Sequence, residues 1–308
     1  MSALGGATRV LALAAVLALT LVGGNASATL PGKNGPLLIS TFIKKGSPNY
    51  STYLYKETLA GKAKKLLGSV ETSFYDGAVS PNGRRIVYSR YPGYQLWLGP
   101  FANPGKAKAI TELDPELNNG DSVFAPDGKS IYYSATYYTG AGVGWHLRRY
   151  SLETGKTRSY ELDPQTNLGP ADVSPNGRLL TYGHGSDEDE SAIRFLDTRT
   201  GKSRAFKFKS PTLGGSFSPD GRSIAFTSPV KDAWEVYVAR LDGKGVRRLT
   251  RGLKVNLSPV FSPDGRQVAF TQGTDAYKRI GIVTLKTGKV KYVKAPGDYT
   301  KVDQWLRR

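Results

Sequence analysis

The side chains most suited to metal binding or acid–base chemistry in this 308-residue sequence are two histidines and a run of four acidic residues. His184 precedes the run Asp-Glu-Asp-Glu at 187–190. Carboxylate oxygens suit a hard cation such as Ca²⁺, so a Ca²⁺ loop is one interpretation. The run lacks the spaced alternation and the backbone-carbonyl positions of such a loop. A solvated acidic loop is therefore preferred, and no metal or cofactor is expected.

Other catalytic patterns are incomplete. The chain contains no cysteine, which excludes thiol catalysis, disulfides and thiolate metal sites. Gly-Lys-Ser/Thr occurs at 128–130, 155–157 and 201–203, but the glycine that begins a phosphate-binding loop is missing each time. Ser228 and Lys231 have the Ser-x-x-Lys spacing without its companion motifs, and Gly-x-Ser-x-Gly is absent. The sequence therefore favours a protein that is not an enzyme.

Tyrosines are the better candidates for ligand contacts. They offer a large amphipathic surface at low entropy cost, which suits peptide or sugar ligands. Several lie in or near the irregular segments that separate strand-like runs. The candidate binding residues are Tyr50, Tyr91, Tyr94, Tyr137, Tyr138, His184, Asp187, Asp189 and Tyr277.

Five copies of a ten-residue motif organise the chain that must position these residues. The clearest copies are 217–226 (FSPDGRSIAF) and 261–270 (FSPDGRQVAF), and looser ones begin at 79, 124 and 173, so the spacing is 44 to 49 residues. Proline ends a strand, Asp-Gly or Asn-Gly makes a tight turn, and the run that follows is typical of a strand. A second strand and a short basic strand after a Gly-Lys turn complete the unit. Each repeat therefore predicts four antiparallel strands.

The sixth repeat is split between the two ends of the chain. Gly-Lys turns occur six times, beginning at 61, 105, 155, 201, 243 and 288. Residues 301–306 align with the strand before the Pro-Asp-Gly turn, and residues 34–43 align with the turn and the strand after it. Pairing of the first strand with the last is expected to close the array into a ring without free sheet edges.

The motif resembles the WD40-like (PD40) repeat of TolB-type β-propellers, and the resemblance covers nearly all of residues 29–308. It implies an all-β fold: a six-bladed β-propeller of four-stranded antiparallel blades, with the closing blade shared by the N- and C-termini. TolB-like proteins carry an α/β domain before the propeller, whereas here the leader runs directly into a strand.

Residues 1–28 have the pattern of a signal peptide. Arg9 precedes an apolar run at 10–22, and the small residues 26–28 (ASA) predict cleavage after Ala28. The run has thirteen residues, whereas a spanning helix needs roughly twenty, and a retained anchor is the alternative. An exported chain without disulfides is typical of a bacterial envelope protein, periplasmic or extracellular.

Basic residues concentrate in the six segments that begin with Gly-Lys. These segments contain 18 Lys and Arg and no acidic residue, within a total of 43 basic and 25 acidic residues. One interpretation is protection of exposed edge strands, and the other is a cationic belt that associates weakly with anionic envelope polymer or membrane surface. The residues chosen to represent this basic belt are Lys207, Lys209, Arg247, Arg248, Lys291 and Lys294.

Two faces follow from the four-stranded unit. The Pro-Asp-Gly and Gly-Lys turns share one face, the turn face, and the longer, variable loops share the other, the loop face. Variable loops on a rigid scaffold usually carry binding. The sequence therefore predicts a monomeric, non-enzymatic scaffold that binds a protein, peptide or glycan partner through its loop face, with no specific binding of nucleic acid. A propeller enzyme such as a metal-dependent polysaccharide lyase is the alternative.

Overall fold

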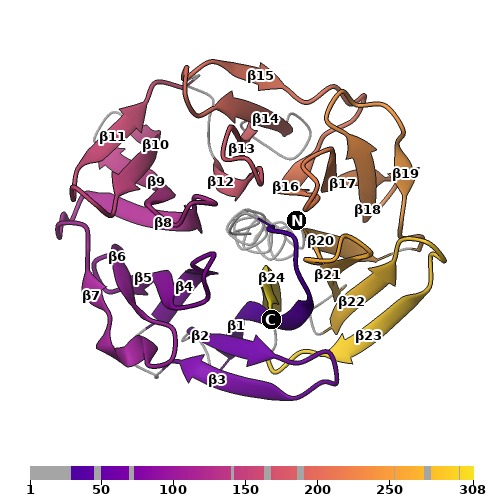
Figure 1. Cartoon of the computed structure of the whole chain (residues 1–308), viewed down its shortest axis with the longest axis horizontal. Coiled ribbons are helices and arrows are strands. Elements are labelled where there is room, and N and C mark those ends of the chain that lie inside the picture. Colours follow the sequence, from indigo (N-terminus) through magenta and orange to yellow (C-terminus); the bar gives the residue numbers. More distant parts are fainter. Residues whose placement is uncertain are drawn as a thin grey trace, which may run out of the picture.

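The structure is a computed structural model and describes residues 29–44, 50–68, 73–139, 142–162, 168–185, 191–252, 254–273, 279–297 and 299–308. These residues form six four-stranded antiparallel sheets, arranged as blades around a central axis (Figure 1). The six-bladed β-propeller predicted from the repeats is therefore confirmed. The predicted signal peptide, residues 1–28, lies outside the described residues.

Each blade runs from an innermost strand at the axis to an outer strand at the rim. The closing blade comprises β24 (Tyr299–Arg307), β1 (Asn34–Lys44), β2 (Tyr50–Glu57) and β3 (Ala63–Leu67). The second comprises β4 (Ser73–Val79), β5 (Arg85–Tyr91), β6 (Gln95–Pro100) and β7 (Lys108–Ala109), with a 3₁₀ turn, η1 (Pro104–Lys106), before β7. The third comprises β8 (Leu117–Phe124), β9 (Ser130–Thr139), β10 (Gly142–Ser151) and β11 (Thr157–Tyr160). The fourth comprises β12 (Leu168–Val173), β13 (Leu179–His184), β14 (Ala192–Asp197) and β15 (Ser203–Ala205). The fifth comprises β16 (Leu213–Phe217), β17 (Ser223–Val230), β18 (Ala233–Arg240) and β19 (Arg247–Arg248). The sixth comprises β20 (Val255–Phe261), β21 (Gln267–Gly273), β22 (Arg279–Thr284) and β23 (Val290–Lys294).

The Pro-Asp-Gly turns are held by the serine that precedes the proline. In the fifth blade, Ser218 Oγ donates to Asp220 Oδ1 (2.6 Å) and accepts a hydrogen bond from Ser223 N (2.9 Å). The same bonds occur in the second, fourth and sixth blades. Gly221 has φ 69°, in the left-handed region that favours glycine. The third blade has Ala125 at the serine position, so it makes this turn without the side-chain bonds.

The same motif connects neighbouring blades. A Cβ added at Gly221 would lie 3.5 Å from Cδ of Pro175 in the preceding blade, and one added at Gly265 would lie 3.2 Å from Cγ of Pro219. In the second to fifth blades, the motif proline therefore ends its strand and also packs against the glycine of the next turn around the ring.

The ring closes as the repeat analysis predicts, by antiparallel pairing of β1 with β24. Leu37 is opposite Trp305 in this pairing, and Trp305 Nε1 donates to the carbonyl of Gly35 (3.1 Å). A Cβ at Gly35 would approach the carbonyl oxygen of Leu306 to 2.8 Å, so the closure needs a glycine there.

The hydrophobic core is divided into layers between the blades. Six clusters of buried side chains each combine residues from two neighbouring blades; one joins Phe195 of the fourth blade to Phe217 and Phe226 of the fifth. A blade therefore buries both of its faces only when its neighbours are present.

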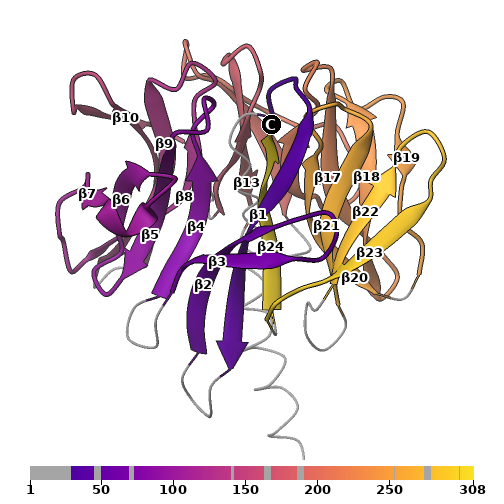
Figure 2. The same cartoon turned by 60° about the horizontal axis from the view of Figure 1, so that its bottom comes forward.

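Residues 29–33 cross the axis on the turn face before β1 begins. Thr29 Oγ1 lies 3.5 Å from Ser216 Oγ in β16, Leu30 packs against the cluster between the third and fourth blades, and Gly32 N donates to Pro263 O (3.0 Å). Figure 1 shows this indigo segment running from the middle of the ring toward β1. In Figure 2 the C-terminus lies at the turn face, above, and β1 and β2 extend furthest toward the loop face, below.

Candidate functional site

Four aromatic rings form a continuous row on the loop face, from the closing blade to the second blade. Ring centroids are 6.0 Å apart for Phe42 and Tyr75, 6.1 Å for Tyr75 and Tyr94, and 5.4 Å for Tyr94 and Tyr91. We call Phe42, Tyr75, Tyr94 and Tyr91 the aromatic row. Pairs at this separation contribute roughly 0.5–1.5 kcal/mol each beyond the area that they bury.

Three elements position the row. Phe42 lies near the end of β1, Tyr75 lies in β4, and Tyr91 and Tyr94 flank the turn between β5 and β6. Tyr94 has φ 41°, and its carbonyl accepts a hydrogen bond from Asn119 N of the third blade (2.9 Å). The conformation of this turn is therefore stabilised by the third blade as well as by its own hairpin.

Leu113 extends the row outward. Its side chain is 66 % exposed, and that of Tyr91 is 47 % exposed. A Cβ at Gly93, which has φ 95°, would lie 2.6 Å from Leu113 Cδ1, so the leucine packs directly over this glycine. Apolar side chains left in solvent next to one another are typical of an interaction surface.

A cluster of charged side chains lies beside Tyr75, on the innermost strands of three neighbouring blades. Lys301 Nζ donates to Asp76 Oδ1 (2.8 Å), and the lysine side chain is only 2 % exposed. Ser40 Oγ donates to Asp303 Oδ2 (2.5 Å), and Ser134 Oγ donates to Asp121 Oδ2 (3.2 Å). We call Asp76, Asp121, Asp303 and Lys301 the axial charge cluster.

Burial dominates the ionisation of this cluster. It raises the pKa of Asp121 to about 7 and that of Asp303 to about 8, and the neighbouring carboxylates add to both shifts while Lys301 opposes them. Burial lowers the pKa of Lys301, but the carboxylates around it outweigh this effect and the net shift is upward. The lysine therefore stays charged, and Asp121 and Asp303 change their protonation near neutral pH.

The structure brings together only some of the predicted binding residues. Tyr91 and Tyr94 are neighbours in the aromatic row, whereas Tyr137 lies in β9, where its ring makes an edge contact with His146 (5.0 Å). His184 ends β13 in the fourth blade, away from both. For Tyr50 and Tyr138 only the backbone, in β2 and β9, is described, and Asp187, Asp189 and Tyr277 lie outside the described residues. The role of all these residues stays a prediction.

Sequence reasoning missed Phe42, Tyr75 and Leu113. Phe42 and Tyr75 stand within strand-like runs, where an aromatic residue predicts packing and not ligand contact. Their place in the row depends on contacts between the closing and second blades, for which the sequence carries no local signal.

The basic belt differs from the prediction in two details. Strand β15 ends at Ala205, so Lys207 and Lys209 follow the outer strand and do not lie in it; Phe206, between strand and lysines, packs against Phe226 with centroids 5.1 Å apart. Arg248 is not a free surface charge, because its Nη2 lies 3.0 Å from Oε1 of the buried Glu235.

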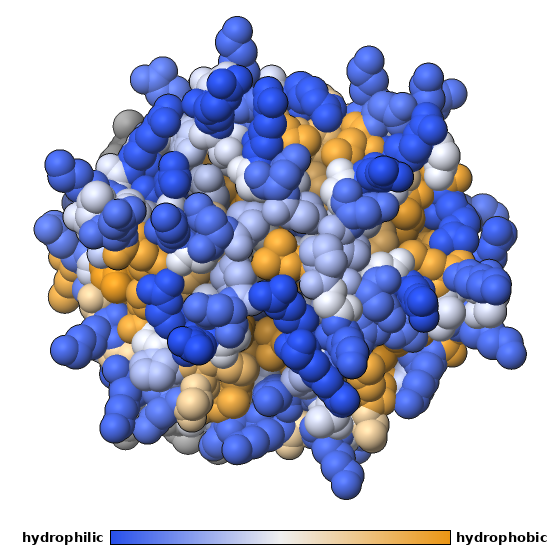
Figure 3. All heavy atoms as spheres, in the orientation of Figure 1, coloured by the Kyte–Doolittle hydropathy of each residue, from blue (hydrophilic) through white to orange (hydrophobic). Residues whose placement is uncertain are grey.

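Two of the remaining belt residues make contacts between blades. Arg247 Nη1 donates to Leu285 O (2.7 Å), and Lys291 Nζ donates to Leu59 O (3.0 Å). Lys294 is exposed at the end of β23. Figure 3 shows hydrophilic side chains projecting around the whole rim of the turn face. The belt thus combines exposed charge with structural hydrogen bonds.

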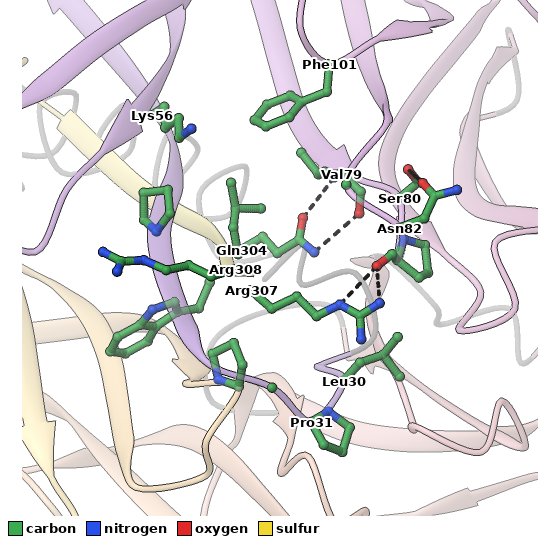
Figure 4. A pocket seen from close by; sticks show the side chains of 17 residues that line it. Leu30, Pro31, Lys56, Val79, Ser80, Asn82, Phe101, Gln304, Arg307 and Arg308 are labelled. Atoms are coloured by element: carbon green, nitrogen blue, oxygen red, sulfur yellow. Dashed lines mark hydrogen bonds between the residues drawn. The ribbon is translucent and has the colours of Figure 1, made fainter.

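A cavity of about 380 Å³ lies on the turn face, beside the C-terminus (Figure 4). Arg307 donates from Nε and Nη2 to Pro81 O (3.1 and 2.6 Å), and the Gln304 side chain bonds to the backbone N and O of Val79 (2.8 and 3.3 Å). These contacts join the closing blade to the second blade, so Arg307 and Gln304 serve the fold.

No helix among the described residues is long and apolar enough to span a bilayer. No group of three or more histidine, aspartate or glutamate side chains in that part of the chain is arranged to hold a metal ion.

Comparisons with known proteins agree with the repeat and the fold. The family model of the TolB β-propeller domain (PD40) matches residues 156–308. The Tol-Pal system protein TolB of Anaeromyxobacter dehalogenans strain 2CP-C is 31 % identical over 120 residues, which is 37 % of this chain and 26 % of that protein. The match thus spans about a quarter of the relative's length.

Solved structures share most of the ring. TolB from Acinetobacter baumannii superposes with a TM-score of 0.74 at 20 % identity, covering 91 % of this chain and 68 % of that one. An oligogalacturonate lyase in complex with manganese superposes with a TM-score of 0.54 at 13 % identity, covering 85 % and 74 %. At these identities the similarity shows the fold alone, and the fold is shared by an enzyme and by a Tol system protein. The recurring Pro-Asp-Gly turns, the six four-stranded blades and the family match together identify this chain as a six-bladed β-propeller of the TolB type, built from WD40-like (PD40) repeats.

Proposed function

We propose that this propeller is a non-enzymatic scaffold that binds a protein partner in the bacterial cell envelope through its loop face. The observation that carries the proposal is the aromatic row with Leu113: a connected apolar surface, partly exposed, on a rigid frame. Tyrosine combines apolar ring area with a hydroxyl group, and such side chains are enriched at protein interfaces. The relatives named as TolB are Tol-Pal system proteins, which supports an envelope role.

The frame suits binding without a large conformational change. Tyr94 is held by a backbone hydrogen bond to the third blade, and Leu113 is packed over Gly93. A surface that is ordered before binding loses less entropy when the partner docks.

We also propose that residues 1–28 direct export and are removed after Ala28, which N-terminal sequencing of the protein from the envelope fraction would test.

Site-specific photo-crosslinking tests the proposed surface. p-Benzoylphenylalanine replaces Leu113 in one protein. In the control it replaces Val246, another exposed apolar residue (43 %), which lies on the rim. After irradiation of intact cells, position 113 should form a discrete crosslinked band that position 246 does not form. Adding Tyr91→Ser to the first protein should reduce that band.

The proposal is wrong if both positions give the same crosslinks, or if Tyr91→Ser leaves the band at 113 unchanged. Thermal unfolding of each variant is the control for folding. Both replaced side chains are largely exposed, so their Tm values should stay close to that of the wild type.

A further inference from the structure

A second recess, independent of the aromatic row, lies between the second and third blades. It has a volume of about 330 Å³, and its walls carry Tyr133 of β9, Tyr137 of the same strand and Tyr150 of β10. This volume is at the lower end of the range of ligand pockets, about 300–1,000 Å³. It therefore suits a ligand the size of one sugar ring or one amino-acid residue.

An unsatisfied amide lies in the wall of this recess. Asn119 is only 1 % exposed, and neither its Nδ2 nor its Oδ1 has a hydrogen-bond partner among the described residues. Buried side-chain amides are normally bonded, because leaving one without partners costs roughly 1–3 kcal/mol. Folding alone does not account for an asparagine in this state.

The sixth blade provides an internal comparison. Asn256 occupies the same position of the repeat, five residues before the last residue of the innermost strand, and is also buried. Its Nδ2 donates to Trp234 O (3.0 Å) and Lys254 O (3.0 Å), and its Oδ1 accepts a hydrogen bond from Gln272 (2.8 Å). The fold can thus satisfy an asparagine at this position, and in the third blade it does not.

The other polar groups of the recess indicate the chemistry of the ligand. The Arg148 guanidinium lies 5.2 Å from the Tyr137 ring, and its buried Nε has no hydrogen-bond partner within the described part of the chain. Thr157, Glu112 and Asp114 also line the recess, so charges of both signs are present. Flat rings surrounded by hydroxyl, amide and guanidinium groups match a neutral ligand that has apolar C–H faces and several hydroxyl groups.

We propose that this recess binds a neutral pyranose sugar, and preferably one with an acetamido group. An N-acetyl sugar would supply partners for both atoms of Asn119, since the acetamido C=O would accept from Nδ2 and a neighbouring ring hydroxyl would donate to Oδ1. The tyrosine rings would then pack against the apolar faces of the sugar. This site is separate from the proposed protein-binding surface, although Asn119 N also supports Tyr94 through its backbone.

Titration with free sugars tests the proposal directly. N-Acetylglucosamine should bind the full-length protein and shift the NMR signals of the third blade, and glucose, which lacks the amide, should bind at least fivefold more weakly. Asn119→Leu should weaken the binding of N-acetylglucosamine at least tenfold. The same variant should keep or raise the Tm, because an apolar side chain of similar shape removes an unsatisfied amide.

Asn256→Leu is the matched control, with the opposite signature. It should lower the Tm, because it breaks satisfied bonds, and leave sugar binding unchanged. Tyr137→Ala and Arg148→Gln provide variants on half-buried residues in case Asn119→Leu does not fold, and each should weaken the binding of N-acetylglucosamine.

Three outcomes would overturn the proposal. The first is no binding of either sugar to the wild type. The second is sugar binding that survives Asn119→Leu, Tyr137→Ala and Arg148→Gln. The third is binding of N-acetyl-glycylglycine amide in the absence of sugar binding, which would make the recess a peptide site. Loss of sugar binding would leave the crosslinks at Leu113 untouched, so the two proposals fail separately.

Discussion

Replacing Lys301 by methionine should destabilise the protein strongly at alkaline pH and much less at acid pH. Lys301 is buried against Asp76 and close to Asp121 and Asp303. The variant keeps the length of the side chain and removes its charge. The carboxyl groups then remain in the axial charge cluster without their cation.

The size of the effect follows from burial. Breaking a buried ion pair by removing one partner costs about 3–5 kcal/mol, because the remaining charge stays desolvated. For a chain of this size, 1 kcal/mol corresponds to about 2–4 °C in Tm, so the expected decrease at pH 8.5 is roughly 6–20 °C.

The pH dependence has a definite sign. The folded-state pKa values of Asp121, about 7, and Asp303, about 8, are above the ordinary value, so the folded state binds more protons than the unfolded state between pH 4 and 8. Their contribution to stability is complete below pH 4 and decreases as the pH rises through 7 to 8. Lys301 lowers both pKa values, and its removal raises them further. At pH 5.5 the variant should therefore hold Asp121 and Asp303 neutral and lose less stability than at pH 8.5.

Thermal unfolding of wild type and variant at pH 5.5, 7.0 and 8.5 provides the measurement. Arg240→Met is the matched control: it removes one partner of the Arg240–Asp242 pair, whose side chains are 59 % and 52 % exposed. Solvent-exposed pairs of this kind contribute little to stability, so the control should change little at any pH. An equal loss of Tm at pH 5.5 and 8.5 for Lys301→Met, or a loss no larger than that of Arg240→Met, would refute this account of the axial charge cluster.

Three further predictions concern the ring, its turns and its rim. Deletion of residues 303–308 removes most of β24, including Trp305, and should lower the Tm by more than 10 °C, as differential scanning calorimetry would show; an unchanged Tm contradicts closure by this strand. Ala125→Ser should raise the Tm by about 2–4 °C, because the new hydroxyl can make the turn hydrogen bonds, worth about 1 kcal/mol, that a serine makes in four other blades. Ser262→Ala should lower the Tm by a similar amount. A decrease in Tm for Ala125→Ser would refute this role of the hydroxyl. Co-sedimentation of the protein with anionic vesicles should decrease as salt is added and when the exposed lysines of the belt are neutralised. If the wild type does not sediment even at low salt, the role of these lysines is protection of the edge strands. The variant for that test replaces with glutamine Lys207, Lys209, Lys291 and Lys294, and retains Arg248 because Glu235 depends on it.

The fold was predictable because its signals are local and repeated. Proline, Asp-Gly and the following β-branched run define a turn and a strand within ten residues, and the spacing of the copies gives the number of blades. Ring closure was predictable from the incomplete motif at each end. The contact between the glycine of one turn and the proline of the preceding blade, as in Gly221 and Pro175, was not, because it joins residues 46 positions apart by sequence number.

The candidate sites were less predictable, because they depend on which blades are neighbours. Tyr91 and Tyr94 could be selected from their place in a loop. Phe42 joins them only through packing across a blade boundary. Asn119 and Asn256 show the limit most clearly: they have the same identity and the same place in the repeat, yet among the described residues only Asn256 has partners for its amide. The decisive difference lies in the side chains that surround them.

Residues 29–33 make the two faces of the propeller differ. The segment contacts Ser216 in the fifth blade, the core layer between the third and fourth blades, and Pro263 in the sixth blade. The segment therefore links opposite sides of the ring across its axis. This link limits widening of the central opening at the turn face, whereas the described residues include no comparable link across the loop face. Any force that separated the blades would therefore open the ring at the loop face before the turn face.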